Sequence, residues 1–323
     1  MRLLRRAAIA AACLVPFGAV PGLAQDYPTK SINLIVPSSP GSAPDVIGRV
    51  LSDSLSRVLG QPVVADNRAG AGGTLGAAIA ADAPADGYTL LLVNVNQPAG
   101  EELYPDLGYD LLGDFIPVTR IASSFYVFVV PATTEVKTLA EMIDLIKEKP
   151  GQLNYASAGV GAGTFTVAEL FKASAGGLDL IHIPYNGGGP ALASIVAGET
   201  DLYGSPYSTA KPFIDDGKLR PLAVSSAERS PYLPDVPAVS ETLPGFAFPD
   251  WYGIVVPEGT PQEIVEKLHA AVSQSLADEE VVKRLDAVGF VPVHETPQEF
   301  GDFLKSEVEK SGKLIRENNL RPN

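Results

Sequence analysis

The sequence is poor in the side chains that most often carry covalent or metal chemistry. It contains one cysteine, three histidines and two methionines among 323 residues. The cysteine, Cys13, lies in an N-terminal segment that we expect to be removed on export. Without it the mature chain has no disulfide, no thiolate nucleophile and no Cys-ligated metal. An exported protein without cysteine avoids oxidative mispairing, which favours the bacterial periplasm.

Basic residues are also scarce, since 24 Lys and Arg stand against 38 Asp and Glu, giving a net charge of −14. Proteins that bind nucleic acid need a basic surface, so we expect no nucleic-acid partner. No apolar run after the N-terminal segment reaches the roughly 20 residues that span a bilayer, so we expect a soluble mature chain. The histidines lack metal-ligand spacing and no Walker lysine follows a Gly-rich loop, so we expect no metal and no cofactor.

The N-terminal segment has the order of a secretory signal peptide. A basic stretch, Met1–Arg6, precedes an apolar stretch, Ala7–Ala19, and small residues end at Ala24. This pattern predicts a signal peptide over residues 1–24, cleavage before Gln25 and Sec export to the periplasm. A permanent membrane anchor and lipidation at Cys13 are the alternatives, and both are disfavoured because the apolar stretch is short and interrupted by proline and glycine.

The rest of the chain alternates short apolar runs with stretches of helical periodicity. Such alternation predicts an α/β fold in which parallel sheets pack between helices. We expect strands at Ser31–Val36, Gln61–Ala65, Tyr88–Val93, Leu153–Ala156, Leu180–Ile183, Leu202–Tyr203 and Leu219–Val224. We expect helices from Ala43 to Leu59, from Thr74, from Leu139 to Lys149, from about Thr166, from Pro190 to Gly198 and from Gln262 to Leu276.

One internal echo indicates how the chain is divided. Phe125–Pro131 and Trp251–Pro257 are similar strands about 126 residues apart, and each ends in a proline and leads into a helix. They mark the places where the chain would enter and leave a second lobe. We therefore expect a discontinuous lobe 1 made of residues 25–125 plus 247–323, and a lobe 2 made of residues 126–246.

The loops after the strands are rich in Gly and Ser and lead into helix N-termini, where backbone N–H groups favour anions. Segments 37–45, 94–98, 157–166 and 184–190 contain no Lys or Arg. An anion there would be held by N–H dipoles, hydroxyls and water. Asp45, three residues after Ser42, fits a capping box, and Glu169 after Thr166 repeats the pattern. For Asp45 the capping role and a role at the site are compatible.

The sequence offers little for an enzyme. Ser157 lacks the first Gly of a nucleophile elbow. His182 falls inside an expected strand, where a structural histidine is the simpler interpretation. Gly159-Val160-Gly161 with Asp179 partly matches a dinucleotide-binding fingerprint. In that fingerprint the ribose-binding acid lies at the end of the next strand, whereas Asp179 precedes it. We therefore expect no assembled nucleophile–base pair and no enzymatic activity.

Several segments together resemble the solute receptors of tripartite tricarboxylate transporters, the TctC or Bug family. The resemblance extends in order over nearly the whole mature chain. Its segments are Tyr27-Pro28, Ile32–Pro37, Pro40–Ala43, Asp45-Val46, Leu59–Val64, Asn67–Gly73, Asp86–Leu91, Leu153–Gly159, Glu169–Lys172, Ile183–Tyr185, Gly217–Arg220, Arg229-Ser230 and Leu233–Pro237.

The resemblance implies a periplasmic receptor with a type II-like, two-lobed binding-protein fold, each lobe a sheet flanked by helices and hinged by crossing strands. Such a receptor captures a small organic carboxylate between its lobes and delivers it to membrane permease subunits; we expect a monomer. The ligand contacts carried over from the family are Ser38, Gly41, Ser42, Ala43, Asp45, Ser157, Gly159, Val160, Gly161, Ala162, Gly163 and Thr164. To these we add the polar loop positions Asn94, Tyr203 and Ser205.

The chain also departs from the family pattern. Ser38–Ser42 stands where Phe-Pro-Pro-Gly-Gly is usual, Val160–Gly163 where Asn-Gly-Thr-Ser is common, and Asn186 where a Lys is customary. These changes predict a less polar distal pocket, suited to a monocarboxylate or an aromatic or apolar acid better than to citrate. Two alternatives remain: a ligand sensor that feeds a membrane signalling protein, and, from another class, a periplasmic hydrolase.

Overall fold

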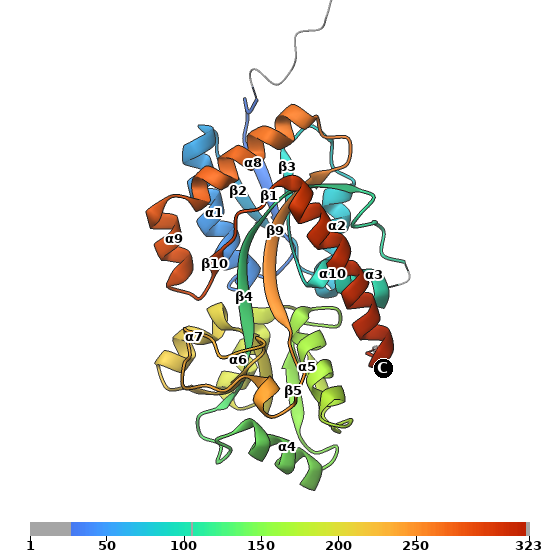
Figure 1. Cartoon of the computed structure of the whole chain (residues 1–323), viewed down its shortest axis with the longest axis vertical. Coiled ribbons are helices and arrows are strands. Elements are labelled where there is room, and N and C mark those ends of the chain that lie inside the picture. Colours follow the sequence, from blue (N-terminus) through green and yellow to red (C-terminus); the bar gives the residue numbers. More distant parts are fainter. Residues whose placement is uncertain (1–26, 105, 321–323) are drawn as a thin grey trace, which may run out of the picture.

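The computed structural model describes residues 27–104 and 106–320, and two α/β lobes joined by long strands make up the molecule (Figure 1). The expected signal segment, residues 1–24, lies outside the described residues. Within the described ranges, no helix combines the length and the apolar character needed to cross a bilayer.

The first lobe is built on three parallel strands whose apolar runs are buried. β1 (Ile32–Val36) lies between β2 (Val63–Asn67) and β3 (Thr89–Asn94). β2 begins two residues later than the expected strand, because Pro62 has no N–H to give to a ladder. The carboxyl ends of β1 and β3 therefore reach the same edge of the sheet, and their loops open there.

Two long strands connect the lobes. β4 (Phe115–Pro131) pairs antiparallel with β9 (Pro249–Pro257) along its first part, through Phe125. From Tyr126 onward β4 pairs instead with β7 (Leu202–Pro206) and β8 (Leu219–Val224). One strand carries the chain out and the other carries it back, which forces them to run in opposite directions.

This geometry adds antiparallel pairs to the expected parallel sheets. Antiparallel pairs join β3 to β9, β4 to β7, β8 and β9, and β10 (Val291–Pro292) to β4. Parallel pairing is confined to the strands that are linked through helices. In the second lobe these are β5 (Asn154–Ser157), β6 (Ile181–Pro184) and β7.

Helices cover both faces of the first-lobe sheet, because successive residues of its buried strands face opposite sides. Leu34 and Leu92 pack under α1 (Ala43–Leu59), α8 (Gln262–Leu276) and α9 (Glu279–Asp286). Ile35 and Leu91 belong to the other face, covered by α2 (Thr74–Ala81), α3 (Asn96–Leu103) and α10 (Pro297–Glu317).

The second lobe has the same layering. α4 (Leu139–Glu148) and α5 (Gly163–Ser174) contribute to the core on one face, while α6 (Gly188–Ala197) and α7 (Tyr207–Asp215) pack on the other. The expected bounds of α8 are confirmed. α5 begins at Gly163, three residues before the expected Thr166, and α6 begins at Gly188, two residues before Pro190.

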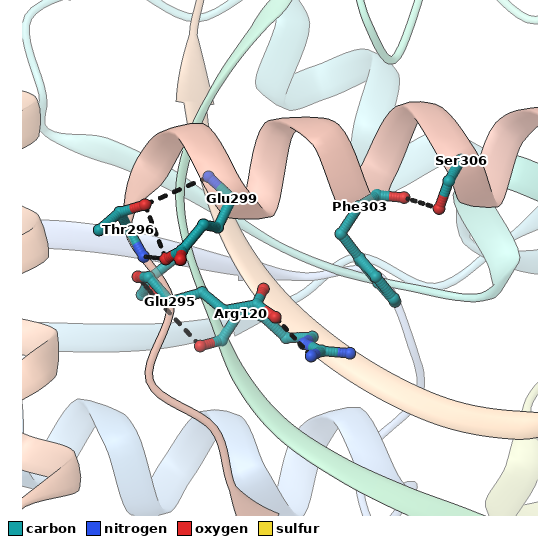
Figure 2. Close-up of polar contacts among 7 residues, drawn as sticks. Arg120, Glu295, Thr296, Glu299, Phe303 and Ser306 are labelled. Atoms are coloured by element: carbon teal, nitrogen blue, oxygen red, sulfur yellow. Dashed lines mark hydrogen bonds and ion pairs between the residues drawn. The ribbon is translucent and has the colours of Figure 1, made fainter.

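The first turn of α10 is fixed to β4 by polar contacts (Figure 2). Thr296 and Glu299 form a reciprocal capping box, in which each side chain accepts from the other residue's backbone N–H. Arg120 of β4 pairs with Glu295, and its guanidinium lies 4.2 Å from the centre of the Phe303 ring. These contacts hold α10 against the strand that crosses between the lobes.

Candidate ligand-binding cleft between the lobes

Two adjoining cavities lie where the loops of the two lobes meet. The first, called here the tyrosine cavity, measures about 40 Å³ and is lined by Tyr126, Tyr203 and Tyr252. The second, the glycine cavity, measures about 100 Å³ and is lined by Gly70–Gly73, Gly159 and Gly187. Ser38, Asn96, Ala158 and Ala162 line both, so the cavities form one cleft. Since about 15 Å³ of such space holds one water, the cleft has room for a small ligand.

The N-terminus of α1 forms one wall of the tyrosine cavity, through Ser42, Ala43 and Pro44. The expected capping box at Ser42 and Asp45 is wrong. The Ser42 backbone N–H donates to the Ser39 carbonyl at 3.3 Å, and the Ser42 hydroxyl donates to the same oxygen at 2.7 Å. The Asp45 carboxylate instead accepts from the Gly41 N–H at 2.9 Å. Asp45 thereby fixes the turn before the helix.

The negative charge of the Asp45 carboxylate is stabilised by neighbouring groups of the protein. Burial alone would raise the pKa of this carboxyl, but the Arg49 guanidinium, 2.9 Å away, and the Gly41 N–H outweigh burial and lower the pKa. Asp45 is therefore ionised at neutral pH. It lies in the wall behind the cleft and lines neither cavity.

The N-terminus of α5 forms the facing wall, through Ala162, Gly163 and Thr164. The Thr164 hydroxyl accepts from the Ala158 N–H at 2.9 Å and so closes the loop after β5. Gly159 and Gly161 have φ of 110° and 80°, values that L side chains rarely adopt, so the loop needs glycine at both positions. Each lobe thus aims one helix N-terminus at the cleft.

The second expected capping box is also wrong. Thr166 lies inside α5 rather than before it, and its hydroxyl donates back to the Ala162 carbonyl at 3.3 Å. Glu169 accepts from the Tyr155 hydroxyl and pairs with Lys172 at 2.7 Å. Glu169 is therefore a helix-surface partner of β5 and not a cap.

Three tyrosines form the floor where the crossing strands meet the second lobe. Burial raises the pKa of Tyr126, Tyr203 and Tyr252, so all three are neutral donors. The Tyr203 hydroxyl is buried, and no described residue meets the distance and angle of a hydrogen bond to it, although the nearby Ser205 side chain partly offsets the rise in its pKa. Tyr126 and Tyr252 both donate to Asp250, which is fully buried. Burial, only partly offset by these phenols, raises the pKa of Asp250 to about 7.

The two lobes touch across the cleft. Asn96 of α3 accepts from the Gly163 N–H at 2.7 Å, and the Tyr104 hydroxyl donates to the Val160 carbonyl at 2.8 Å. A Cβ on Gly72 would lie 2.6 Å from that same carbonyl oxygen. The structure therefore has its lobes closed over the cleft.

The residues expected at the site divide into two groups. Those that line one or both cavities are Ser38, Ser42, Ala43, Asn94, Gly159, Val160, Ala162, Gly163, Thr164 and Tyr203. Those that line neither are Gly41, Asp45, Ser157, Gly161 and Ser205. Of the second group, Gly41 is exposed and the other four are buried, and all five belong to turns, strand ends or the first turn of α1 next to the first group.

Ser157 and His182 do come together, contrary to the expectation that no nucleophile–base pair assembles. The Ser157 hydroxyl lies 2.6 Å from His182 Nε2, because β5 and β6 pair in parallel register and the His182 ring stacks on Tyr155. The same hydroxyl accepts from the Gly159 N–H at 3.0 Å. Ser157 is fully buried and lines neither cavity, so the pair supports the glycine loop from behind the cleft.

Sequence reasoning missed several residues of the cleft. Tyr126 and Tyr252 line the tyrosine cavity, with Asp250 beneath them, and Asn96 and Tyr104 reach across from α3 and its end. A signal for the first two was present. In the internal echo, Phe125-Tyr126 corresponds to Trp251-Tyr252, so the same position of each crossing strand supplies a tyrosine.

The lining of the cleft carries no formal charge. No Lys, Arg, His, Asp or Glu occurs among the described residues that line either cavity. Over residues 27–104 and 106–320, no three His, Cys, Asp or Glu side chains are grouped closely enough to hold a metal ion. The groups that could favour an anion in the cleft are therefore uncharged, and the helix N-termini that line it, those of α1 and α5 among them, are each equivalent to about half a positive charge.

Comparisons with known proteins agree with this architecture. Residues 47–320 match the model of the tripartite tricarboxylate transporter family receptor, TctC. The chain is 35% identical over 304 residues to Protein BugT of Bordetella pertussis, covering 93% of this chain and 92% of that one.

Two solved structures are similar throughout. One is a protein of R. palustris with adipate, at 31% identity and a TM-score of 0.87, covering 91% of this chain and 99% of that one. The other is MatC from Rhodopseudomonas palustris with bound malate, at 31% identity and a TM-score of 0.86, covering 90% and 100%. This chain belongs to the TctC or Bug family of tripartite tricarboxylate transporter solute receptors.

Proposed function

We propose that this chain is a periplasmic receptor that closes on a small organic carboxylate and delivers it to the membrane subunits of a tripartite tricarboxylate-type permease. The family membership supports the class of protein. The relatives solved with adipate and with malate support a carboxylate as the ligand. The permease is the partner that a receptor of this family requires.

One feature of the cleft carries the proposal: it offers an anion only uncharged donors. The N-termini of α1 and α5 face it, and the buried Tyr203 hydroxyl has no protein partner among the described residues. A buried unpaired hydroxyl costs roughly 1–3 kcal/mol, and a ligand oxygen would remove that cost. Preorganised N–H and O–H donors stabilise a carboxylate without the desolvation of a lysine or arginine.

Each lobe contributes part of the proposed site, so binding favours closure. Lobe 1, which we place at residues 25–125 and 247–323, supplies Ser38, Ser42 and Asn94. Lobe 2, residues 126–246, supplies Ala162, Thr164 and Tyr203. A ligand that touches both lobes has a higher affinity for the closed form and shifts the population toward it.

The expected residues that line neither cavity take a positioning role in this proposal. Asp45 holds the Gly41 N–H, and Ser157 holds the Gly159 N–H. Ser205 shares a hydrogen bond with Thr209, which itself lines the tyrosine cavity. Their substitution should weaken binding through the shape of the loops.

We also propose export with cleavage before Gln25 and a monomeric mature form. The mass of the protein recovered from the periplasmic fraction tests the first, and its elution volume in size-exclusion chromatography tests the second. A full-length mass in that fraction, or elution as a dimer, would correct these points without affecting the cleft.

The ligand proposal is tested by a panel of acids in thermal-shift and calorimetric titrations. Adipate, malate, citrate and benzoate cover long, hydroxylated, tricarboxylic and aromatic acids, and adipamide is the uncharged match for adipate. We expect at least one acid to raise the melting temperature and to saturate, and adipamide to do neither. If the amide binds as well as its acid, the cleft does not recognise a carboxylate.

A further inference from the structure

A carboxyl group lies directly beneath the floor of the cleft. Asp250 is the second residue of β9, directly after the exposed Pro249, and is itself 0% exposed. Its two oxygens accept from two phenols: Oδ1 from Tyr126 at 3.4 Å and Oδ2 from Tyr252. Both phenols line the tyrosine cavity, whereas Asp250 does not.

The surroundings of Asp250 contain few groups that could share its charge. From β4 it faces Tyr126, and from β9 itself Tyr252 and the Trp251 backbone. Tyr203 of β7 approaches Tyr126, and α5 brings Gly163, whose Cα lies against the Tyr126 hydroxyl. Glu307 of α10 bonds the Trp251 indole, whose side chain points to the opposite face of β9. None of these groups is a cation that would neutralise an ionised Asp250.

The protonation of Asp250 determines where the two phenols point. An ionised carboxylate only accepts, so it holds both phenolic hydrogens away from the cleft. A protonated carboxyl donates its own hydrogen to one phenol oxygen and leaves that phenol free to donate elsewhere. The free donor lies at the wall of the tyrosine cavity, where no described lining residue carries a charge.

We propose that Asp250 is a positioning residue that takes up a proton from solvent when a carboxylate enters the tyrosine cavity. The proton binds one Asp250 oxygen, and the phenol released from that oxygen donates to the ligand. The ligand carboxylate and an ionised Asp250 are then never buried together. This inference rests on the carboxylate-receptor function proposed above and deepens it, because it makes binding depend on pH.

The direction of the pH dependence follows from the linkage between proton binding and ligand binding. Burial raises the pKa of Asp250 to about 7 in the closed structure, and a bound carboxylate nearby raises it further. Above that pKa the free protein binds fewer protons than the complex, so binding takes up protons and affinity falls as pH rises. Below it Asp250 is already protonated in both states, and the affinity levels off.

Isothermal titration with adipate at pH 6, 7, 8 and 9 tests the proposal, with malate as the second probe. Each titration is run in two buffers of different ionisation enthalpy, so that proton uptake is measured directly. We expect close to zero protons at pH 6, a substantial fraction of one proton at pH 8, and an affinity that falls several-fold from pH 7 to pH 9. The Asp250→Asn variant, which stays neutral, should bind with the same affinity at every pH and take up no proton.

Two further variants test whether the pH dependence comes from Asp250. Glu169→Gln alters a tyrosine–carboxyl pair outside the cleft, the one with Tyr155, and should retain the wild-type pH profile. Tyr252→Phe removes a hydrogen bond that stabilises ionised Asp250, so it should move the fall in affinity to higher pH even if Asp250→Asn does not fold.

The outcomes separate the two proposals. If neither adipate nor malate nor any other acid of the panel binds at pH 6, the receptor function fails and this inference falls with it. If an acid binds but takes up no proton at pH 8, or if Asp250→Asn keeps the wild-type pH profile, only the role of Asp250 is overturned.

Discussion

The side-chain oxygen of Asn96 accepts the backbone N–H of Gly163 at 2.7 Å, so a residue of one lobe caps the first turn of a helix in the other. A helix N-terminus has N–H groups without intrahelical partners. In α5 one of these is satisfied only when the lobes are together. Closure and the local stability of α5 are therefore coupled.

Removing this cap should weaken ligand binding. Asn96→Ala deletes a cross-lobe hydrogen bond that exists only in the closed form, so we expect a loss of about 0.5–1.5 kcal/mol of binding free energy, or roughly 2- to 13-fold in Kd. Calorimetric titration with a ligand identified from the panel measures it. Asn33→Ala, which removes a bond to Asp66 at the far end of β1, is the matched control and should leave Kd unchanged. An equal loss in both variants would contradict the coupling.

The first turn of α5 also leads to a prediction based on steric overlap. A Cβ at Gly163 would lie 2.7 Å from the Val95 side chain and 2.9 Å from the Tyr126 ring, and would overlap the Tyr126 hydroxyl. Gly163→Ala should therefore displace Tyr126 within lobe 2 and push Val95 of lobe 1 away, which opposes closure. Since overpacking costs about 1–3 kcal/mol, we expect binding to weaken roughly 5- to 150-fold. Gly301 of α10 lines neither cavity, and the nearest atom to a Cβ there is 3.4 Å away, so Gly301→Ala is the control.

Small-angle scattering with and without ligand, alongside the titration, distinguishes the two variants. We expect ligand to compact the wild type and Gly301→Ala but not Gly163→Ala. A Gly163→Ala protein that compacts normally and binds normally would show that the closed geometry seen here is not the one that holds the ligand.

Tyr203→Phe should affect stability and binding in opposite directions. Its hydroxyl is fully buried without a partner among the described residues, so removing it should leave the free protein as stable as wild type or stabilise it by about 1 kcal/mol. Ligand affinity should fall several-fold, because the proposed donor is lost. Urea unfolding and calorimetry measure the two effects.

The control for this variant is Tyr155→Phe, which loses its bond to Glu169 away from the cleft. It should lower stability and leave affinity unchanged. If Tyr203→Phe instead lowers stability and leaves binding unaffected, the hydroxyl has a structural role and the tyrosine cavity is not the carboxylate site.

Local patterns predicted the elements well. The helical periodicity of Gln262–Leu276 gave α8, and the run before Pro37 gave β1. Such local patterns could not predict which strands pair where the two lobes join. The contact of Tyr126 with Asp250 joins residues 124 apart in sequence, and it exists because β4 and β9 lie side by side. The antiparallel pairs that make the sheet mixed depend on the same long-range return of the chain.

The candidate site shows a similar division. Ser42 and Thr164 are recognisable because a polar residue at a helix start has a local reason to be there. Asn96 has no such signal, since its partner, Gly163, lies in another lobe. The error at Asp45 has a physical cause as well: the capping-box pattern identifies an acid that accepts a backbone N–H, but here the turn presents the N–H of Gly41 instead of that of Ser42.

His182 leads to a prediction about acid stability. Burial is the largest influence on its ring and, with Lys172, lowers its pKa, while Glu169 opposes them. The unfolded chain, where the pKa is near its ordinary value of about 6.5, therefore binds the proton more readily than the folded protein. Stability should be fully present above that value and should fall as pH decreases through it toward the folded-state pKa.

Urea unfolding at pH 7.5, 6.5 and 5.5 measures this loss. His182→Gln removes the titrating ring, so its free energy of unfolding should be lower at pH 7.5, where the bond to Ser157 is lost, but should fall less toward pH 5.5. His294→Gln, at an exposed position, should follow the wild type. A wild-type slope in His182→Gln would mean that other groups cause the acid loss, and that the Ser157–His182 pair braces the glycine loop without sensing pH.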